Sequence, residues 1–264
     1  MRVVSLHPDV LVATSRIWQT NCTIIRGKVA AGEGGETFVI DSPILPDELE
    51  ILPALLEQSG YPPPGGLLVT HADWDHLLGR LAFPDATIGC SRTSAERMQA
   101  TPGTPQRELR DFDEQHYLHR PRPLALGAVQ ALDVPGRCEI GSQELALHPT
   151  EGHTGDGMVV SIDWAGVLVA GDYLSTVEIP VLGEGGSIAS YLSTLERLRP
   201  LVSEVERVVP GHGPVLDRQR ALAVLEEDVA YLSALREHSA AAELPQGRRT
   251  RAQRAIHAQN TASL

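Results

Sequence analysis

Histidine and aspartate residues recur at the ends of four short apolar runs, and this pattern limits the folds that the chain can adopt. The first group occupies residues 70–76, Thr-His-Ala-Asp-Trp-Asp-His, directly after the apolar run 66–69. Single residues follow three later runs, each near a glycine that lets the backbone approach closely: His153, Asp172 and His212. Imidazole nitrogens and carboxylate oxygens are ligands that zinc, iron and manganese accept. The sequence therefore predicts a fold that gathers four strand ends around one metal site.

The first group carries four of the candidate ligands in six residues. His71, Asp73 and Asp75 alternate along the chain, so in an extended segment they would point to the same side, with His76 beside them. A polar loop that holds these residues by chance is the alternative for this segment taken alone. A lone histidine at a strand end is more often a satisfied polar residue than a ligand. Four such strand ends in one chain favour a shared site.

The chain is large enough for a substantial core. It has 264 residues, of which 42% are hydrophobic and 21% are charged. No repeat or linker divides it, so residues 1–240 are predicted to form one domain. The three cysteines, Cys22, Cys90 and Cys138, are widely separated and predict neither a disulfide scaffold nor a cysteine zinc site.

The net charge of -12 would repel phosphate backbones and acidic membranes, so we expect no nucleic-acid partner and no membrane partner. The sequence holds no apolar run of membrane-spanning length, and its N-terminus is typical of a strand, not a secretory signal. A soluble cytoplasmic protein is expected, of unassigned oligomeric state. Residues 241–264 are predicted to be a basic C-terminal tail or terminal helix in solvent, with a nucleic-acid contact as the alternative. Its arginines are Arg248, Arg249, Arg251 and Arg254.

Short β-type runs at 10–14, 22–26 and 37–41 predict an antiparallel meander at the N-terminus. A helix is predicted next, with Asp47 as its N-cap and Pro53 kinking or splitting it. Two amphipathic helices are predicted near the C-terminus, capped by Ser187 and Asp217. Further strands are predicted at 86–90, 145–148, 158–163, 167–170 and 208–209.

Residues 101–123 follow no regular pattern, because four prolines lie among charged residues. This segment is predicted to be an irregular insertion, either a lid over a binding site or a solvated loop. Four polar side chains outside the strand-end groups are expected at the surface, with a place at the site as the alternative if the chain folds back: His116, His119, His257 and Asn260.

The ordered ligand set, His71-x-Asp73-x-Asp75-His76 followed by His153, Asp172 and His212, resembles the metallo-β-lactamase superfamily. The predicted order of strands and helices is similar over nearly all of residues 3–238. The resemblance implies an α/β (α+β) fold, a four-layer αββα sandwich of two packed mixed β-sheets with helices on both outer faces. It also implies two divalent metal ions, zinc by family analogy. His71, Asp73 and His153 would hold the first ion, Asp75, His76 and His212 the second, and Asp172 would bridge them.

Asp73 departs from the family pattern, which has histidine at this position. Two divalent ions, three carboxylates and a bridging hydroxide carry no net charge together, whereas a histidine at 73 would leave one positive charge. The extra carboxylate should weaken the first ion as a Lewis acid and favour manganese or iron over zinc. Aspartate is also shorter, so the ion must shift, bind through water or be lost. We expect two ions, because His71 and His153 are both present.

These features predict a metal-dependent hydrolase in which a metal-bound water or hydroxide cleaves a small ester, thioester or lactone. Asp75 is predicted to be the catalytic residue that orients this water and accepts its proton. The resemblance points to the glyoxalase-II-like and lactonase-like group, because the chain offers neither basic surface for RNA nor a flavin-binding domain. Three alternatives stay open: a mononuclear iron dioxygenase for persulfides, a phosphodiesterase and a metal-binding protein without turnover.

Overall fold

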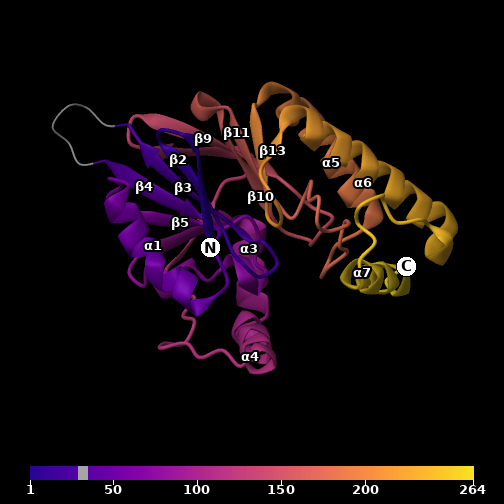
Figure 1. Ribbon diagram of the computed structural model, residues 1–264, viewed down its shortest axis with the longest axis horizontal. Helices are drawn as coiled ribbons and strands as arrows, with labels where there is room; N and C mark the ends of the chain where they lie inside the picture. Colours follow the sequence, from indigo (N-terminus) through magenta and orange to yellow (C-terminus); the bar gives the residue numbers. More distant parts are fainter. Residues whose placement is uncertain (29–34) are drawn as a thin grey trace.

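The computed structural model describes residues 1–28 and 35–264, apart from the side chain of Ala240, and within them two mixed β-sheets pack face to face (Figure 1). The first sheet has the strand order β1-β2-β3-β4-β5-β6-β7. Its strands β1 to β4 are antiparallel neighbours, and β4 to β7 run parallel. Its strands are β1 (Arg2–His7), β2 (Val10–Thr14), β3 (Asn21–Gly27), β4 (Glu36–Ile40), β5 (Gly66–Leu68), β6 (Thr87–Ser91) and β7 (Val129–Leu132).

The second sheet has the order β13-β12-β11-β10-β9-β8, with β11 and β12 parallel and the other pairs antiparallel. Its strands are β8 (Gly136–Ile140), β9 (Gln143–Pro149), β10 (Met158–Ile162), β11 (Val167–Gly171), β12 (Arg207–Pro210) and β13 (Leu216–Asp217). β10 and β11 form the predicted strand pair, joined by the short 3-10 turn η2 (Asp163–Ala165).

Helices cover both outer faces of the sheet pair. On the first sheet lie α1 (Pro46–Gln58), α2 (Gly79–Ala82), α3 (Arg92–Ala100) and α4 (Thr104–His116), and on the second sheet lie α5 (Ile188–Glu204) and α6 (Arg218–His238) (Figure 1). Ser187 and Asp217 cap α5 and α6 as predicted, since their side chains accept hydrogen bonds from the amides of Ser190 and Arg220. The predicted four-layer αββα sandwich is therefore confirmed.

Three apolar layers hold the sandwich together. The central layer, which includes Val12, Ile25, Leu147 and Val169, fills the space between the two sheets. Strands β3, β10 and β11 are buried along most of their length because they are covered on both faces. The outer layers lie under α1 to α4 and under α5 and α6. Among the described residues, none of the helices combines the length and the apolar character needed to span a membrane.

Helix α1 differs from its prediction. It begins at Pro46, so Asp47 lies inside the first turn and is not the N-cap. Proline suits this first position because its missing N–H would be unpaired there anyway. The helix continues through Pro53 to Gln58 instead of splitting, since Leu49, Leu52 and Leu56 are buried against the first sheet. Packing therefore outweighs the hydrogen bond that Pro53 cannot make.

The prediction of an irregular segment at 101–123 was wrong over its central part, where α4 spans Thr104–His116. Pro105 lies in the first turn, where proline does not break a helix. Leu109 and Phe112 are three residues apart on one face and are both buried. Phe112 packs on Trp74, and the centres of the two rings are 4.9 Å apart. The helix thus covers the segment that carries the first group of candidate ligands.

The C-terminal segment packs on the second half of the sandwich, and α7 (Arg251–Ala262) is its helix (Figure 1). The expectation that Arg248 and Asn260 lie at the surface was wrong, because Arg248 is 1% exposed and Asn260 is 0% exposed. Arg248 Nη1 lies 2.5 Å from Asp228 Oδ1 and donates to the carbonyl oxygens of Ser175 and Glu178 at 3.0 and 2.9 Å. Asn260 accepts from the Leu182 amide at 2.9 Å. The segment therefore anchors the loop 175–182.

We predict that Arg248→Met lowers the free energy of unfolding by about 3 kcal/mol, because it removes the buried partner of Asp228 and the donor to the carbonyl oxygens of Ser175 and Glu178. The measurement is urea-induced unfolding of the purified chain. Arg249→Met is the matched control, since Arg249 is 54% exposed, and it should change the free energy by less than about 0.5 kcal/mol. Equal losses in the two variants would contradict the anchoring role of Arg248.

Candidate metal centre

The seven predicted ligands lie together at one edge of the sandwich. His71 follows β5, Asp172 follows β11, His212 follows β12, and His153 lies in the loop between β9 and β10. Hydrogen bonds across the two sheets fix this edge: the Met158 amide donates to the Thr70 carbonyl at 2.7 Å, and Asn21 Nδ2 donates to the carbonyls of Pro210 and Gly213 at 2.8 Å. The four strand ends therefore meet at one edge of the sandwich, as the sequence predicts.

One cluster contains His71, Asp73 and His153. Asp73 Oδ2 lies 3.5 Å from His71 Nε2 and 3.3 Å from His153 Nε2. Four ligand atoms arranged tetrahedrally at about 2.1 Å from an ion would lie about 3.4 Å from each other. The observed separations therefore suit one ion among these three side chains.

A second cluster contains Asp75, His76 and His212. Asp75 Oδ2 lies 3.3 Å from His212 Nε2 and 3.7 Å from His76 Nε2. Asp75 and His76 belong to the 3-10 turn η1 (Trp74–His76), which begins directly after the extended residue Asp73. The turn separates the ligands of residues 70–76 into two clusters, so the alternating pattern expected for an extended segment does not hold beyond Asp73.

Asp172 lies between the clusters. Its Oδ1 is 3.2 Å from His76 Nε2, and its Oδ2 is 3.4 Å from both His153 Nε2 and His212 Nε2. The chain leaves little room here, because a Cβ atom on Gly211 would lie 2.0 Å from Asp172 Oδ1. Glycine is therefore required beside His212 for Asp172 to reach both clusters.

The donor atoms fit divalent metal ions. Several buried atoms that face the space between the clusters have no hydrogen-bond partner among the described residues: His71 Nε2, His76 Nε2, His153 Nε2 and Asp172 Oδ1. Buried polar atoms without partners are costly, so their convergence calls for a cation. Candidate groups with ligand atoms within 4.8 Å of one another include both clusters.

Hydrogen bonds at the opposite ring nitrogens set the histidine tautomers. His153 Nδ1 lies 3.0 Å from the Val181 carbonyl oxygen, and His212 Nδ1 lies 3.1 Å from the Trp18 carbonyl oxygen. A carbonyl only accepts, so each Nδ1 carries a hydrogen, and in the neutral ring each Nε2 keeps a lone pair toward the centre.

Asp41, at the end of β4, supports two more ligands and was missed by the sequence analysis. Its Oδ2 is 3.0 Å from His76 Nδ1 and accepts from the Thr70 hydroxyl at 2.9 Å, and His71 Nδ1 lies 3.1 Å from that hydroxyl. Asp41 has a φ of 56°, in the left-handed region, which costs about 1 kcal/mol or more. The available signal was its position at a further strand end, since β4 is the parallel neighbour of β5.

Glu178, in the loop after β11, was also missed and has no local sequence signal. Its carboxylate belongs with Asp172 and His212 to a third group of ligand atoms within 4.8 Å of one another. Burial, with the charges of Asp172 and Asp75, raises the pKa of Glu178, although His212 opposes this. Glu178 is therefore a carboxyl group that can hold a proton beside the second cluster.

An aromatic group borders the second cluster. Trp74 stands between the candidate ligands Asp73 and Asp75, and its ring centre is 5.6 Å from that of Trp18 and 4.9 Å from that of Phe112. His116 contacts Phe112, with the ring centres 4.4 Å apart and the rings tilted by 42°, and it belongs to neither cluster. The group comes from three separate parts of the chain and lies beside the segment that carries Asp73, Asp75 and His76.

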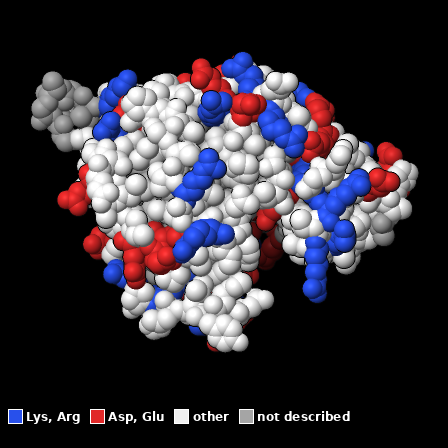
Figure 2. Space-filling model, in the orientation of Figure 1, with Lys and Arg blue, Asp and Glu red and all other residues white. Residues whose placement is uncertain are grey.

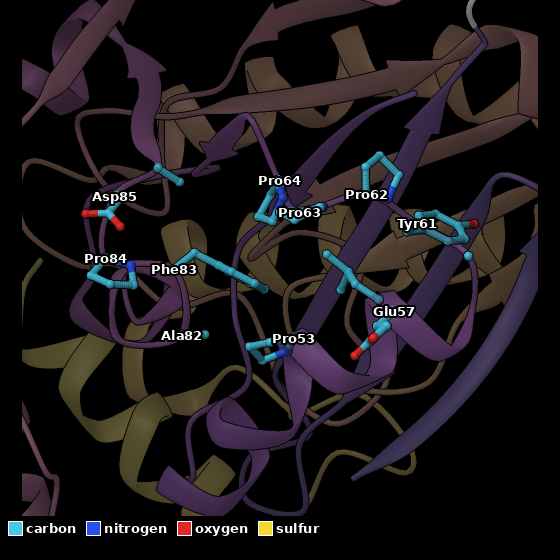
Figure 3. A pocket seen from close by; sticks show the side chains of 13 residues that line it. Pro53, Glu57, Tyr61, Pro62, Pro63, Pro64, Ala82, Phe83, Pro84 and Asp85 are labelled. Carbon is cyan, nitrogen blue, oxygen red and sulfur yellow. The ribbon is translucent and has the colours of Figure 1, made fainter. Parts of the chain in front are cut away.

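A cavity of about 760 Å³ lies elsewhere, between the end of α1 and the residues after α2 (Figure 3). Its lining includes Pro53, Tyr61, Pro63 and Phe83, and none of the seven candidate ligands belongs to it. The chemistry of the centre therefore does not involve this cavity.

A family model described as the metallo-beta-lactamase superfamily matches residues 16–212. No curated protein matches the chain. The fold is similar to that of the metallo-beta-lactamase family protein TTHA1429 from Thermus thermophilus, with 21% identity and a TM-score of 0.63 over 88% of this chain and 83% of that chain. The fold is also similar to that of TTHA1623 in a di-iron-bound form, with 22% identity and a TM-score of 0.59 over 81% of this chain and 97% of that chain. A third similar structure is that of the sec-alkylsulfatase Pisa1 from Pseudomonas sp., with 12% identity and a TM-score of 0.67 over 89% of this chain and 42% of that chain. At these identities the similarity shows the fold.

We predict that the metal-free protein loses stability as the pH rises from about 6.5 to 9. Burial alone would lower the pKa of His153, but the hydrogen bond to Asp73 and the charge of Asp172 raise it to about 9. A group whose pKa is raised by folding adds stability that is complete below its unfolded pKa of about 6.5 and is lost through the folded pKa. Nearby carboxylates also raise the pKa values of His76 and His212 against the effect of burial.

The measurement is the thermal unfolding midpoint in a chelator and in excess zinc across this pH range. Zinc needs neutral imidazoles, so the increase in midpoint that it causes should grow as the pH rises. A midpoint in chelator that stays level or rises over this range would contradict the prediction.

Proposed function

Because this chain belongs to the metallo-beta-lactamase superfamily, we propose that it is a metal-dependent hydrolase that cleaves a small ester, thioester or lactone. The observation that carries the proposal is the convergence of unpartnered, buried ring nitrogens on the Asp172 carboxylate. His71, Asp73 and His153 would hold one divalent ion, and Asp75, His76 and His212 a second, with Asp172 in contact with both. Bound there, such ions would polarise a carbonyl group and lower the pKa of water.

In this proposal Asp75 accepts a proton and Glu178 donates one. Burial tends to raise the pKa of Asp75, but His76 and His212 lower it, so this carboxylate is ionised at neutral pH and can accept a proton. The raised pKa of Glu178 suits a proton donor to the leaving group. Two carboxyl groups whose surroundings separate their pKa values are typical of an acid and base pair.

The surroundings of the centre favour a small, uncharged substrate. Carboxylates of Glu108, Glu178 and Glu184 lie near the clusters, as their mutual electrostatic effects and the contact of Glu184 with Arg97 indicate. Figure 2 shows acidic side chains along the hollow between the α4 region and α7. An acidic site repels phosphodiesters, and the neighbouring aromatic group of Trp18, Trp74 and Phe112 suits an apolar acyl or ring group.

A second candidate, an iron-dependent persulfide dioxygenase, is favoured by the first cluster alone. His71, His153 and Asp73 form a set of two histidines and one carboxylate, which is the donor set of non-haem iron oxygenases. Under this alternative one iron per chain would suffice, and Asp75 would have no direct part in the reaction.

The test is a metal analysis combined with an activity screen on the metal-supplemented protein. Thioesters, lactones, aryl esters and phosphodiesters are the hydrolase substrates, and oxygen consumption with a persulfide tests the alternative. We expect two metal equivalents per chain and turnover of an ester, thioester or lactone. One equivalent would overturn the two-ion site, and oxygen uptake without hydrolysis would overturn the hydrolase.

We predict that Asp75→Asn lowers hydrolysis by at least about a hundredfold, because the amide can neither accept the proton nor hold the second ion in the same way. The fold should remain, as measured by the circular dichroism spectrum. Asp47→Asn is a control on α1, where the carboxylate is 59% exposed. Near-normal hydrolysis by Asp75→Asn would contradict the role of Asp75.

A further inference from the structure

Arg97, on α3, contacts a candidate ligand that the chain supplies as a carboxylate. Its Nη1 lies 2.7 Å from Asp73 Oδ1. We propose that Arg97 and Asp73 act as one unit, in which Arg97 cancels the charge of Asp73 and leaves a single oxygen for the first metal ion. This inference rests on the proposed metal centre and concerns Arg97 as a positioning residue.

The two oxygens of Asp73 have different surroundings. Oδ1 faces Arg97, whereas Oδ2 lies 3.5 and 3.3 Å from the Nε2 atoms of His71 and His153. A carboxylate free to rotate could offer both oxygens to an ion. The contact with Arg97 fixes the orientation, so Asp73 presents one donor atom, as a histidine would.

Arg97 is itself held by other acidic groups. Its Nη1 donates to Asp156 Oδ1 at 2.9 Å, and its Nε donates to Glu184 Oε2 at 3.3 Å. Asp156 in turn accepts from the Ala72 amide at 2.9 Å and from the Ser94 hydroxyl at 2.7 Å. Ala72 stands between the ligands His71 and Asp73, so one network positions both the backbone and the side chain of this segment.

The charge of Arg97 acts at short range in a partly exposed site, since the side chain of Asp73 is 28% exposed. The side chain of Arg97 is 21% exposed, and that of Asp156 is 2% exposed. An opposite charge within about 4–6 Å changes the pKa of a neighbouring group by one unit or more in such surroundings. The guanidinium should therefore reduce the electron donation of Asp73 to an ion.

The net charge of the centre changes when Arg97 is included. Two divalent ions, three ligand carboxylates and one hydroxide carry no net charge, and Arg97 adds one positive charge beside Asp73, which Asp156 and Glu184 share. The expectation that Asp73 favours manganese or iron over zinc was drawn from the charge of Asp73 alone and does not count this neighbouring cation. The pair has the charge of a neutral ligand at this position.

The test is a double-mutant cycle of Asp73→His and Arg97→Met on the full chain, read out by cobalt binding. The absorption spectrum of bound Co²⁺ and the number of equivalents report on the centre without substrate. We expect Asp73→His to weaken the first Co²⁺ at least about tenfold, because it leaves the Arg97 charge unopposed on that side. Adding Arg97→Met to Asp73→His should restore most of this loss.

Two further variants separate charge from structural support. Arg97→Lys keeps the charge, so it should keep two equivalents of Co²⁺ and the wild-type pH profile of hydrolysis. Arg97→Met alone should move the acidic limb of that profile to higher pH by about one unit. Arg92→Met is the control for the cycle, since Arg92 lies on the same helix in an exposed pair with Asp133, and it should not rescue Asp73→His.

Additive losses in the cycle, with the double variant binding Co²⁺ most weakly, would overturn the proposal and leave Arg97 a purely structural clamp. A wild-type chain that binds two equivalents of Co²⁺ but hydrolyses nothing would overturn the proposed function and leave the cycle valid. A wild-type chain that binds no Co²⁺ would overturn both.

Discussion

The structure depends on keeping four imidazoles and three carboxylates within a few ångströms of each other in a place largely closed to water. Asp172 lies within 3.4 Å of three of the histidine rings, and its own Oδ1 has no hydrogen-bond partner among the described residues. Such a group is stable only with cations among its members. Without metal those cations are protons on the histidines. Metal binding at this edge is therefore coupled to the release of protons from the histidines. The rest of the fold holds the ligand side chains in position.

Strands and helix caps could be predicted from the sequence because they depend on neighbouring residues. The alternating and apolar runs of the strands and the side-chain caps Ser187 and Asp217 can be recognised from neighbouring residues, and the seven candidate ligands stand out because each follows a strand. The interpretation of α4 failed because Pro105 was treated as a helix breaker, although at the start of a helix it is not one. The packing of Phe112 on Trp74, which fixes the helix, has no signature in residues 101–123.

The missed members of the centre depend on pairings between distant residues. Asp41 supports His76 only because β4 and β5 are parallel neighbours. Arg97 changes the ligand properties of Asp73, since a carboxylate paired with a guanidinium donates less charge to an ion than an unpaired carboxylate does. The sequence shows that residue 73 is a carboxylate, but the net charge that it brings to the centre can be assessed only once its partner Arg97 is known.

The anchoring of the loop 175–182 has a consequence for how the protein matures. This loop carries the Val181 carbonyl, which orients His153, and the Glu178 side chain, and it is held by Arg248 and Asn260. Every candidate ligand leaves the ribosome before these two residues do. During synthesis the sheets can pair and the ligands can meet while the loop is still unanchored. The anchored form of this loop, which orients His153, can therefore exist only after residues 248–260 have been synthesised.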